Sequence, residues 1–215
     1  MKLLIFDFDG TIGDTAGLII TTMQQTMRAL ELPVLPPATC ATTIGLPLTQ
    51  CFTHILPISE ETGEQCVACY KKLFEQNKNQ LQIRTFPHVK ETLRALHERG
   101  FILTIATSRQ RPSLVHFLEQ MGVLPCFSYL VTVLDVEQSK PAPDMVIKTL
   151  RHFGVEAKDA LVIGDTSFDI LMGQRAGAHT CGVTWGNGTC AELEEAGAEN
   201  IIDDIQELAL SLSLC

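Results

Sequence analysis

Short, nearly continuous runs of hydrophobic residues recur along this chain, and each is about as long as a single β-strand. The runs are rich in branched side chains and alternate little with polar residues, which is typical of strands covered on both faces. We therefore predict strands at residues 3–6, 102–106, 129–134, 160–163, 181–183 and 201–202.

Helix-period segments separate most of these predicted strands. Pro112 and Pro141 stand where a proline is well tolerated, in the first turn of a helix. Strands that alternate with helices at this spacing predict an α/β fold with a doubly wound parallel sheet. The clearest predicted helices lie at 112–121, 141–153 and 168–176.

One long block interrupts this alternation, because residues 15–84 contain no convincing buried strand. We predict that 15–84 form a small all-helical domain inserted after the first strand. Residues 1–14 and 85–215 would then form the α/β core domain. The helical patterns in the block cover 16–30, 48–56 and 60–81, with prolines between them.

The composition is that of a folded, globular chain. Of 215 residues, 46% are hydrophobic and only 19% are charged, which excludes a disordered or fibrous protein. The formal net charge is −9, so nucleic acids and anionic membranes, which attract basic surfaces, are poor partners. No hydrophobic run is as long as a signal segment or a membrane span. We expect a soluble, cytoplasmic protein.

Eight cysteines are scattered along the chain. Without a secretory segment, we expect them to be reduced thiols rather than disulfides. Cys66 and Cys69 form a lone C-x-x-C inside a helical pattern, with no second pair nearby. A zinc or redox site at this pair is therefore not favoured, because zinc sites use four ligands at characteristic spacings.

The most informative segment is Phe6-Asp7-Phe8-Asp9-Gly10-Thr11, which places two carboxylates directly after a buried strand. In open α/β sheets, ligands bind at the carboxyl ends of the strands. Carboxylates are costly there unless a cation or hydrogen bonds compensate them. Taken alone, the pair fits a ligand site and an ordinary turn or helix cap about equally well.

A second acidic segment and two strand-end groups favour the ligand site. Asp165 ends another predicted strand, Asp169 follows four residues later, and parallel neighbouring strands would bring both to the edge that carries Asp7. Converging carboxylate oxygens suit Mg²⁺. Thr107-Ser108 and Lys140 could hold phosphoryl oxygens, although singly they would be read as a cap and a surface lysine.

In this order and at these intervals, the residues resemble the four motifs of the haloacid dehalogenase superfamily of aspartyl phosphohydrolases. The resemblance covers almost the whole chain, and the helical block is similar to the α-helical cap of one class of that superfamily. It implies a Rossmann-like core with a cap. The matching motifs are Asp7-x-Asp9-Gly10-Thr11, Thr107, Lys140 and Gly164-Asp165-x-x-x-Asp169.

The resemblance implies a role for each matching residue. Asp7 would be the nucleophile that forms an aspartyl-phosphate, and Asp9 would be the general acid and base. Thr107 and Lys140 would bind the phosphoryl group. The expected Mg²⁺ ligands are Asp7, Asp9 (through its backbone carbonyl), Asp165 and, through water or by orienting its neighbours, Asp169. The expected substrate-binding residues are Thr11, Gly45, Thr107, Ser108 and Lys140.

Within the superfamily, Asp9 argues against the dehalogenases, which lack a second aspartate. The absence of lysine between Lys2 and Lys71 argues against the phosphonate-cleaving members, which need one early in the cap. Gly164-Asp165-Thr166 is most similar to the phosphoglycolate phosphatases. The substrate would be a small phosphorylated molecule. A β-phosphoglucomutase-like phosphomutase, a pyrophosphatase and a non-catalytic binding module remain alternatives.

Three further expectations concern the surroundings of the site. Gly45 would allow a cap loop to approach the substrate, and a monomer is expected because the cap already covers the site. His88 replaces a glycine that is common in the family, which favours a structural substitution. Candidate contacts for a second anionic group, each of which is more readily interpreted as part of a solvated helix face, are Arg28, His54, Lys71 and Lys72.

Overall fold

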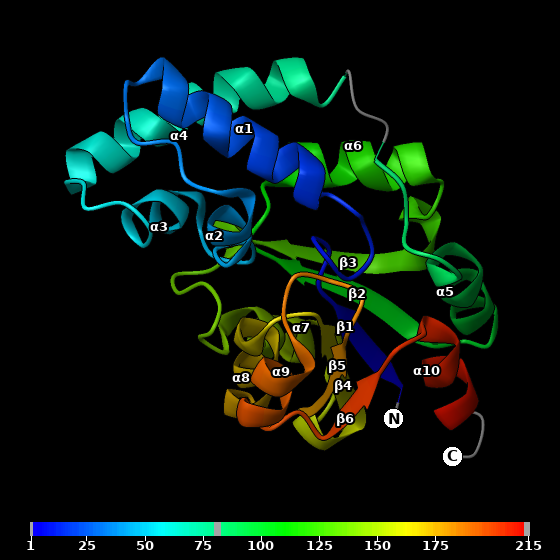
Figure 1. Ribbon diagram of the computed structural model, residues 1–215. Coiled ribbons are helices and arrows are strands. Elements are labelled where there is room, and N and C mark those ends of the chain that lie inside the picture. Colours follow the sequence, from blue (N-terminus) through cyan, green and yellow to red (C-terminus); the bar gives the residue numbers. More distant parts are fainter. Residues whose placement is uncertain (1, 80–82, 213–215) are drawn as a thin grey trace.

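The computed structural model describes residues 2–79 and 83–212. At its centre lies one six-stranded parallel sheet with the order β3-β2-β1-β4-β5-β6, which confirms the predicted doubly wound α/β fold (Figure 1). Each predicted hydrophobic run overlaps a strand. The strands are β1 (Leu3–Phe6), β2 (Ile102–Thr107), β3 (Phe127–Thr132), β4 (Ala160–Gly164), β5 (His179–Val183) and β6 (Asn200–Ile202).

Helices cover both faces of the sheet, and β1 lies in the middle with its residues buried on both sides. Leu4 and Phe6 pack with α5, α6 and α10, whereas Leu3 and Ile5 pack with α7 and α8. This is why the strand reads as a continuous hydrophobic run. The helices around the sheet are α5 (Val89–Glu98), α6 (Arg111–Met121), α7 (Asp144–Phe153), α8 (Ser167–Arg175), α9 (Cys190–Glu195) and α10 (Ile205–Ser211).

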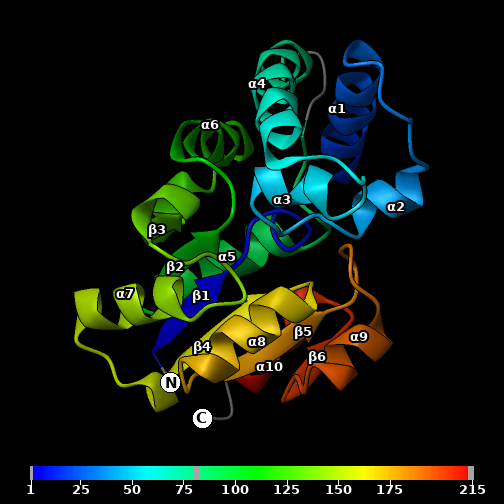
Figure 2. The ribbon, with the colours of Figure 1, turned by 90° about the vertical axis from the view of Figure 1, so that its left-hand side faces the viewer.

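Four more helices follow β1 and lie beyond the carboxyl ends of the strands (Figures 1 and 2). We call them the helical layer. In it α1 packs along α4, and the Asn77 side chain of α4 donates hydrogen bonds to Thr22 and Gln25 of α1. Among the described residues, no helix is both long and apolar enough to cross a membrane. The layer consists of α1 (Ala16–Ala29), α2 (Pro37–Ala41), α3 (Leu48–Thr53) and α4 (Glu60–Asn77).

The two connections between the helical layer and the sheet run side by side. Gly13 on the way out forms an antiparallel bridge with Thr85 on the way back, and the Asp14 N–H donates to the Arg84 carbonyl. The returning chain then enters α5 at His88, whose φ of 60° lies in the left-handed region. Glycine adopts that region without strain. The backbone conformation therefore accounts for the expectation that glycine is common at the position of His88.

The structure corrects several predicted boundaries. Helix α7 begins at Asp144 and not at Pro141, because Pro143 disfavours a helical conformation at the residue before it. Strand β3 ends at Thr132, where a hydrogen-bonded capping box with Asp135 starts a short 3₁₀ turn. The helix predicted over 60–81 ends at Asn77, and residues 80–82 lie outside the described part of the chain.

Candidate active site

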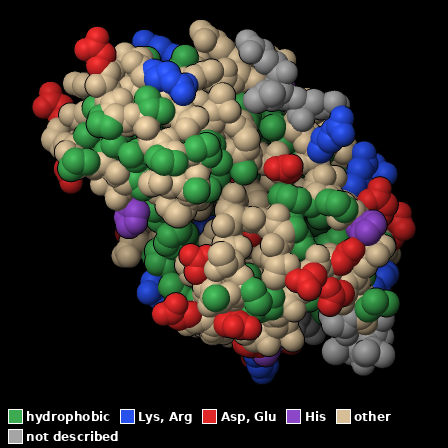
Figure 3. Space-filling model, viewed as in Figure 1, with side chains coloured by type: hydrophobic (Ala, Val, Ile, Leu, Met, Phe, Trp, Pro, Cys, Tyr) green, Lys and Arg blue, Asp and Glu red, His purple; other side chains and the backbone are tan. Residues whose placement is uncertain are grey.

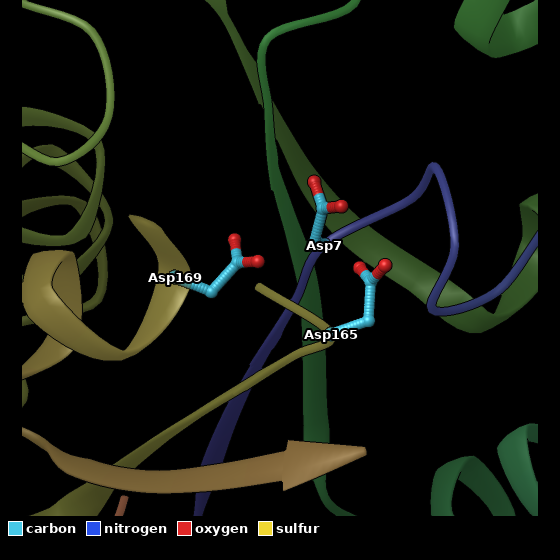
Figure 4. Close-up of side chains that lie close together, drawn as sticks. All are labelled: Asp7, Asp165 and Asp169. Carbon is cyan, nitrogen blue, oxygen red and sulfur yellow. The ribbon is translucent and has the colours of Figure 1, made fainter. Parts of the chain in front are cut away.

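Three buried carboxylates converge at the carboxyl ends of β1 and β4: Asp7, Asp165 and Asp169, each with an oxygen within 4.8 Å of the others (Figure 4). The pairing of β1 with β4 explains this arrangement, because Phe6 lies beside Ile163 and the next residues leave the sheet at the same edge. Asp169 lies in the first turn of α8, and its Oδ2 accepts hydrogen bonds from the N–H and hydroxyl of Thr166.

Lys140 is the cation that faces this group. Its Nζ donates to Asp7 Oδ1 and to Asp169 Oδ1, both at 2.5 Å, and the residue is only 2% exposed. Burial alone would lower the pKa of Lys140, but the two carboxylates raise it above its ordinary value. Lys140 is therefore a fixed positive charge that orients the Asp7 carboxylate.

One ammonium does not compensate three carboxylates. Burial, followed by the charges of neighbouring carboxylates, raises the pKa of Asp7 well above its ordinary value, although Lys140 opposes the effect. Burial and Asp169 raise the pKa of Asp165 to about 6, although Asn187 and Thr11 hydrogen bonds oppose them. Full ionisation of the three carboxyls would leave two negative charges unbalanced, and the donors are hard oxygens. The donor set therefore fits a divalent cation such as Mg²⁺.

A tight cradle holds Asp165. Its Oδ1 accepts from the Thr11 hydroxyl at 3.0 Å, and its Oδ2 accepts from the Asn187 N–H at 2.7 Å and the side-chain amide at 3.0 Å. A Cβ atom at Gly10 or Gly186 would lie 2.1 or 2.3 Å from Asp165 Oδ2, so only glycine permits this approach. Sequence reasoning missed Asn187.

The side chain of Asp9 is bound by residues outside the group of three carboxylates. Its Oδ1 accepts from the Thr15 hydroxyl at 2.6 Å, and Arg109 donates to both carboxylate oxygens. Burial would lower the pKa of Arg109, but Asp9 beside it raises it. Sequence reasoning missed Arg109, although its position directly after the strand-end pair Thr107-Ser108 was a usable signal.

Two cavities adjoin these groups. The smaller, about 70 Å³, is lined among others by Asp7, Asp9, Gly45, Thr107 and Ser108, and matches the size of a phosphoryl group in order of magnitude. The Ser108 hydroxyl donates to the Gly45 carbonyl at 2.6 Å and so joins the sheet to the helical layer across this cavity.

The larger cavity, about 340 Å³, shares Asp9 with the smaller one and extends between α4 and α6. Its lining includes Tyr70, Lys71, Phe74 and Arg109. Figure 3 shows Asp and Glu side chains gathered over the part of the molecule that holds α9 and α10, with Lys and Arg side chains at other places on the same face. The lining of the larger cavity includes both positive groups, Lys71 and Arg109, and carboxylates, Asp9 and Glu75.

The structure places the predicted site residues in three positions. Gly45, Thr107 and Ser108 line the small cavity, and Lys140 donates hydrogen bonds to Asp7, which also lines it, and to Asp169. Thr11, expected to bind substrate, instead donates its hydroxyl to Asp165.

The four candidate contacts for a second anionic group differ in whether they line one of these two cavities. Lys71 lines the larger cavity, whereas Arg28, His54 and Lys72 are not among the described residues that line either cavity. Cys66 is not part of the group of carboxylates that could hold a metal ion in residues 2–79 and 83–212.

Comparison with known proteins points in one direction. The model of a family described as haloacid dehalogenase-like hydrolase matches residues 4–183. The chain is 34% identical over 209 residues to a probable phosphatase, IndB, of Dickeya dadantii, covering 96% of this chain and 91% of that one. It is 33% identical over 180 residues to the pyrophosphatase PpaX of Halalkalibacterium halodurans, covering 84% and 82%.

Two further comparisons agree. The chain is 29% identical over 216 residues to a phosphoglycolate phosphatase of Vibrio cholerae, covering 97% and 95% of the two chains. The crystal structure of a predicted phosphatase from Clostridium acetobutylicum superposes with a TM-score of 0.90 at 25% identity, covering 100% and 99%. The similarity therefore extends over the sheet and the helical layer together.

Proposed function

This chain belongs to the haloacid dehalogenase-like hydrolase family, and from that premise we propose that it is a Mg²⁺-dependent phosphatase. Its substrate would be a small-molecule phosphate monoester, hydrolysed through an aspartyl-phosphate on Asp7. One observation carries the proposal: the buried Asp7 carboxylate is held by Lys140 at a cavity of about 70 Å³, beside two further carboxylates.

In the first step, an Asp7 oxygen attacks phosphorus in line with the leaving oxygen. The new bond joins Asp7 to phosphorus, and the bond from phosphorus to the leaving oxygen breaks. Lys140 supports this step by fixing Asp7 through Oδ1, and its positive charge favours the ionised, nucleophilic form. Thr107 and Ser108 line the cavity where the phosphoryl oxygens would lie, and their hydroxyls are suitable donors.

Asp9 would supply a proton to the leaving oxygen and later take one from the water that hydrolyses the aspartyl-phosphate. Its carboxylate lines both cavities. With the phosphoryl group in the smaller cavity and the rest of the substrate in the larger one, the bond between them would lie near Asp9. The remainder of the substrate would occupy the cavity of about 340 Å³ between α4 and α6.

The residues that would hold Mg²⁺ are Asp7, Asp165 and the backbone carbonyl of Asp9, with Asp169 orienting its neighbours. When bound, the ion supplies positive charge that neutralises the carboxylates and the phosphoryl oxygens. Both oxygens of Asp169 already have partners, Lys140 and Thr166, which supports an indirect role for this residue.

We also propose that the helical layer acts as a cap over the site, as one domain (15–84) carried on the core (1–14 and 85–215). The paired connections at Gly13 and Thr85 would serve as its hinge, and closure would exclude water from the small cavity.

Phosphoglycolate-like monoesters are the first substrate class to test. Inorganic pyrophosphate is the second candidate, because the chain resembles pyrophosphatase PpaX over more than four fifths of its length.

The test is phosphate release from 2-phosphoglycolate, pyrophosphate, β-glucose 1-phosphate and p-nitrophenyl phosphate, with Mg²⁺ and with EDTA. Release that requires Mg²⁺ and disappears in Asp7→Asn supports the proposal. Asp159→Asn, which alters an exposed carboxyl, is the matched control and should retain activity. If folded wild-type protein releases phosphate from none of these compounds, the proposal is wrong. Isomerisation of β-glucose 1-phosphate without release would identify a phosphomutase.

A further inference from the structure

We propose that Arg109 is a positioning residue that holds the Asp9 carboxylate in place for proton transfer. Through Arg109, the orientation of Asp9 would also depend on the position of the helical layer relative to the sheet. The inference rests on the proposed function, in which Asp9 is the general acid. It assigns a role to a buried arginine that the proposed steps do not otherwise use.

The first observation is how completely Asp9 is held. Arg109 Nε donates to Oδ1 at 3.1 Å and to Oδ2 at 3.0 Å, and Nη2 donates to Oδ1 at 2.5 Å. Thr15 adds a third donor to Oδ1 at 2.6 Å. Oδ1 thus has three donors within the described chain and Oδ2 has one. Oδ1 is therefore the oxygen by which the carboxylate is anchored, and Oδ2 is the one with fewer partners.

The second observation is what holds Arg109 itself. The guanidinium carbon lies 5.1 Å from the Phe117 ring centre, 5.3 Å from that of Phe74 and 5.5 Å from that of Phe8. Such contacts with ring faces stabilise a buried cation. Phe8 and Phe117 belong to the core, whereas Phe74 belongs to α4 of the helical layer. If α4 moved away, one wall of this aromatic cage would leave with it.

The third observation concerns the guanidinium edges. Nε and Nη2 are engaged with Asp9, and Nη1 lies 3.5 Å from the Ser113 hydroxyl. The side chain is 7% exposed. A planar guanidinium that donates two or more hydrogen bonds to a carboxylate from one edge fixes the orientation of that carboxylate. These contacts favour positioning of Asp9 over capture of a second anionic group on the substrate, which is the competing role for Arg109.

The test compares two one-ring substrates that differ in how much the leaving oxygen needs a proton. The p-nitrophenolate ion leaves unaided, whereas the alkoxide from benzyl phosphate needs protonation. In Arg109→Met we expect kcat/KM to fall about 100- to 300-fold for benzyl phosphate, at the lower end of the range for general acid catalysis, and less than about threefold for p-nitrophenyl phosphate. Arg109→Lys, which retains a cation, should recover part of the loss.

Asp9→Asn provides a second readout. If Arg109 acts through Asp9, the double variant should be no slower on benzyl phosphate than Asp9→Asn alone, because the two losses share one cause. Arg111→Met is the matched control: it removes an exposed arginine that pairs with Asp135 at 2.7 Å, and both substrates should be unaffected. Phe74→Leu should show a weaker version of the same leaving-group selectivity, and it replaces Arg109→Met if that variant does not fold.

Three results would overturn the proposal. Equal losses on both substrates would indicate a purely structural ion pair, and losses that add to that of Asp9→Asn would show independent action. If Arg109→Met raised KM for 2-phosphoglycolate and not for the other substrates, and so lowered kcat/KM further for that compound alone, Arg109 would be shown to bind a substrate anion. A wild-type protein without Asp7-dependent phosphatase activity would instead defeat the proposed function, and this inference with it.

Discussion

Removing one negative charge from the acidic cluster should stabilise the metal-free protein. The perturbation is Asp165→Asn, measured in EDTA. Asparagine retains the shape of the side chain: one oxygen can still accept from Asn187, and the new amide can donate to the Thr11 hydroxyl, which accepts as well as donates. The cradle is therefore preserved while the charge is lost.

The magnitude follows from the carboxyl's pKa, which rises from 3.8 to about 6 on folding because of burial and the charge of Asp169. At about 1.4 kcal/mol per tenfold difference, ionising Asp165 in the folded protein costs about 3 kcal/mol. Asp165→Asn should remove up to about that cost at pH 8. For a chain of this size, ~3 kcal/mol corresponds to a rise in Tm of about 6–12 °C.

The pH dependence has a definite sign. Because the pKa of Asp165 is higher in the folded state, the folded protein binds more protons between pH 3.8 and about 6. The contribution of this carboxyl to stability is complete below pH 3.8 and is lost as the pH rises through 6. The advantage of Asp165→Asn over wild type should therefore be about half as large at pH 5 as at pH 8.

The assay is thermal unfolding followed by circular dichroism at pH 5 and pH 8, with EDTA and then with Mg²⁺. Wild type should gain Tm from Mg²⁺ at pH 8, and Asp165→Asn should lose most of that gain. Asp159→Asn, at an exposed carboxyl, should match wild type throughout. A lower Tm for Asp165→Asn at pH 8 in EDTA, or an advantage that does not grow with pH, would refute the electrostatic reasoning.

Three other substitutions test separate parts of the site. Lys140→Met leaves its two buried carboxylate partners without a cation, and the free energy of unfolding in urea should fall by about 3–5 kcal/mol; a loss below about 1 kcal/mol would contradict this. Ser108→Ala removes the hydrogen bond to Gly45, costing about 1 kcal/mol, so amide exchange in residues 43–48 should accelerate, and unchanged exchange would speak against the link. Gly10→Ala introduces a Cβ 2.1 Å from Asp165 Oδ2 at a φ of +90°; it should abolish the Mg²⁺-dependent rise in Tm, and a normal rise would disprove the cradle.

Much of the fold could be predicted because it depends on local patterns. A strand covered on both faces must be hydrophobic throughout, so β1, β2 and β4 are legible in the sequence. The boundaries that were wrong, at α7 and β3, depend on proline geometry and on a capping box. Neither proline geometry nor a capping box can be inferred from the spacing of hydrophobic residues.

The acidic part of the candidate site could also be predicted, for a topological reason. Asp7 and Asp165 each follow a buried strand, and parallel neighbouring strands end at the same edge of the sheet. Asp169 lies one helical turn beyond and is brought back by the first turn of α8. Strand order decides whether such residues meet, and the alternating pattern of elements already restricted that order.

The surroundings of Asp9 were decided only by the tertiary structure. Arg109 lies 100 positions away along the chain, and Phe74 reaches it from the helical layer. The two cavities likewise depend on how that layer sits over the sheet. Periodicity reports which face of an element is buried, whereas the angle between packed elements determines which side chains meet. The sequence by itself therefore indicated where the carboxylates lie, whereas the packing of the helical layer on the sheet determined which side chains contact them.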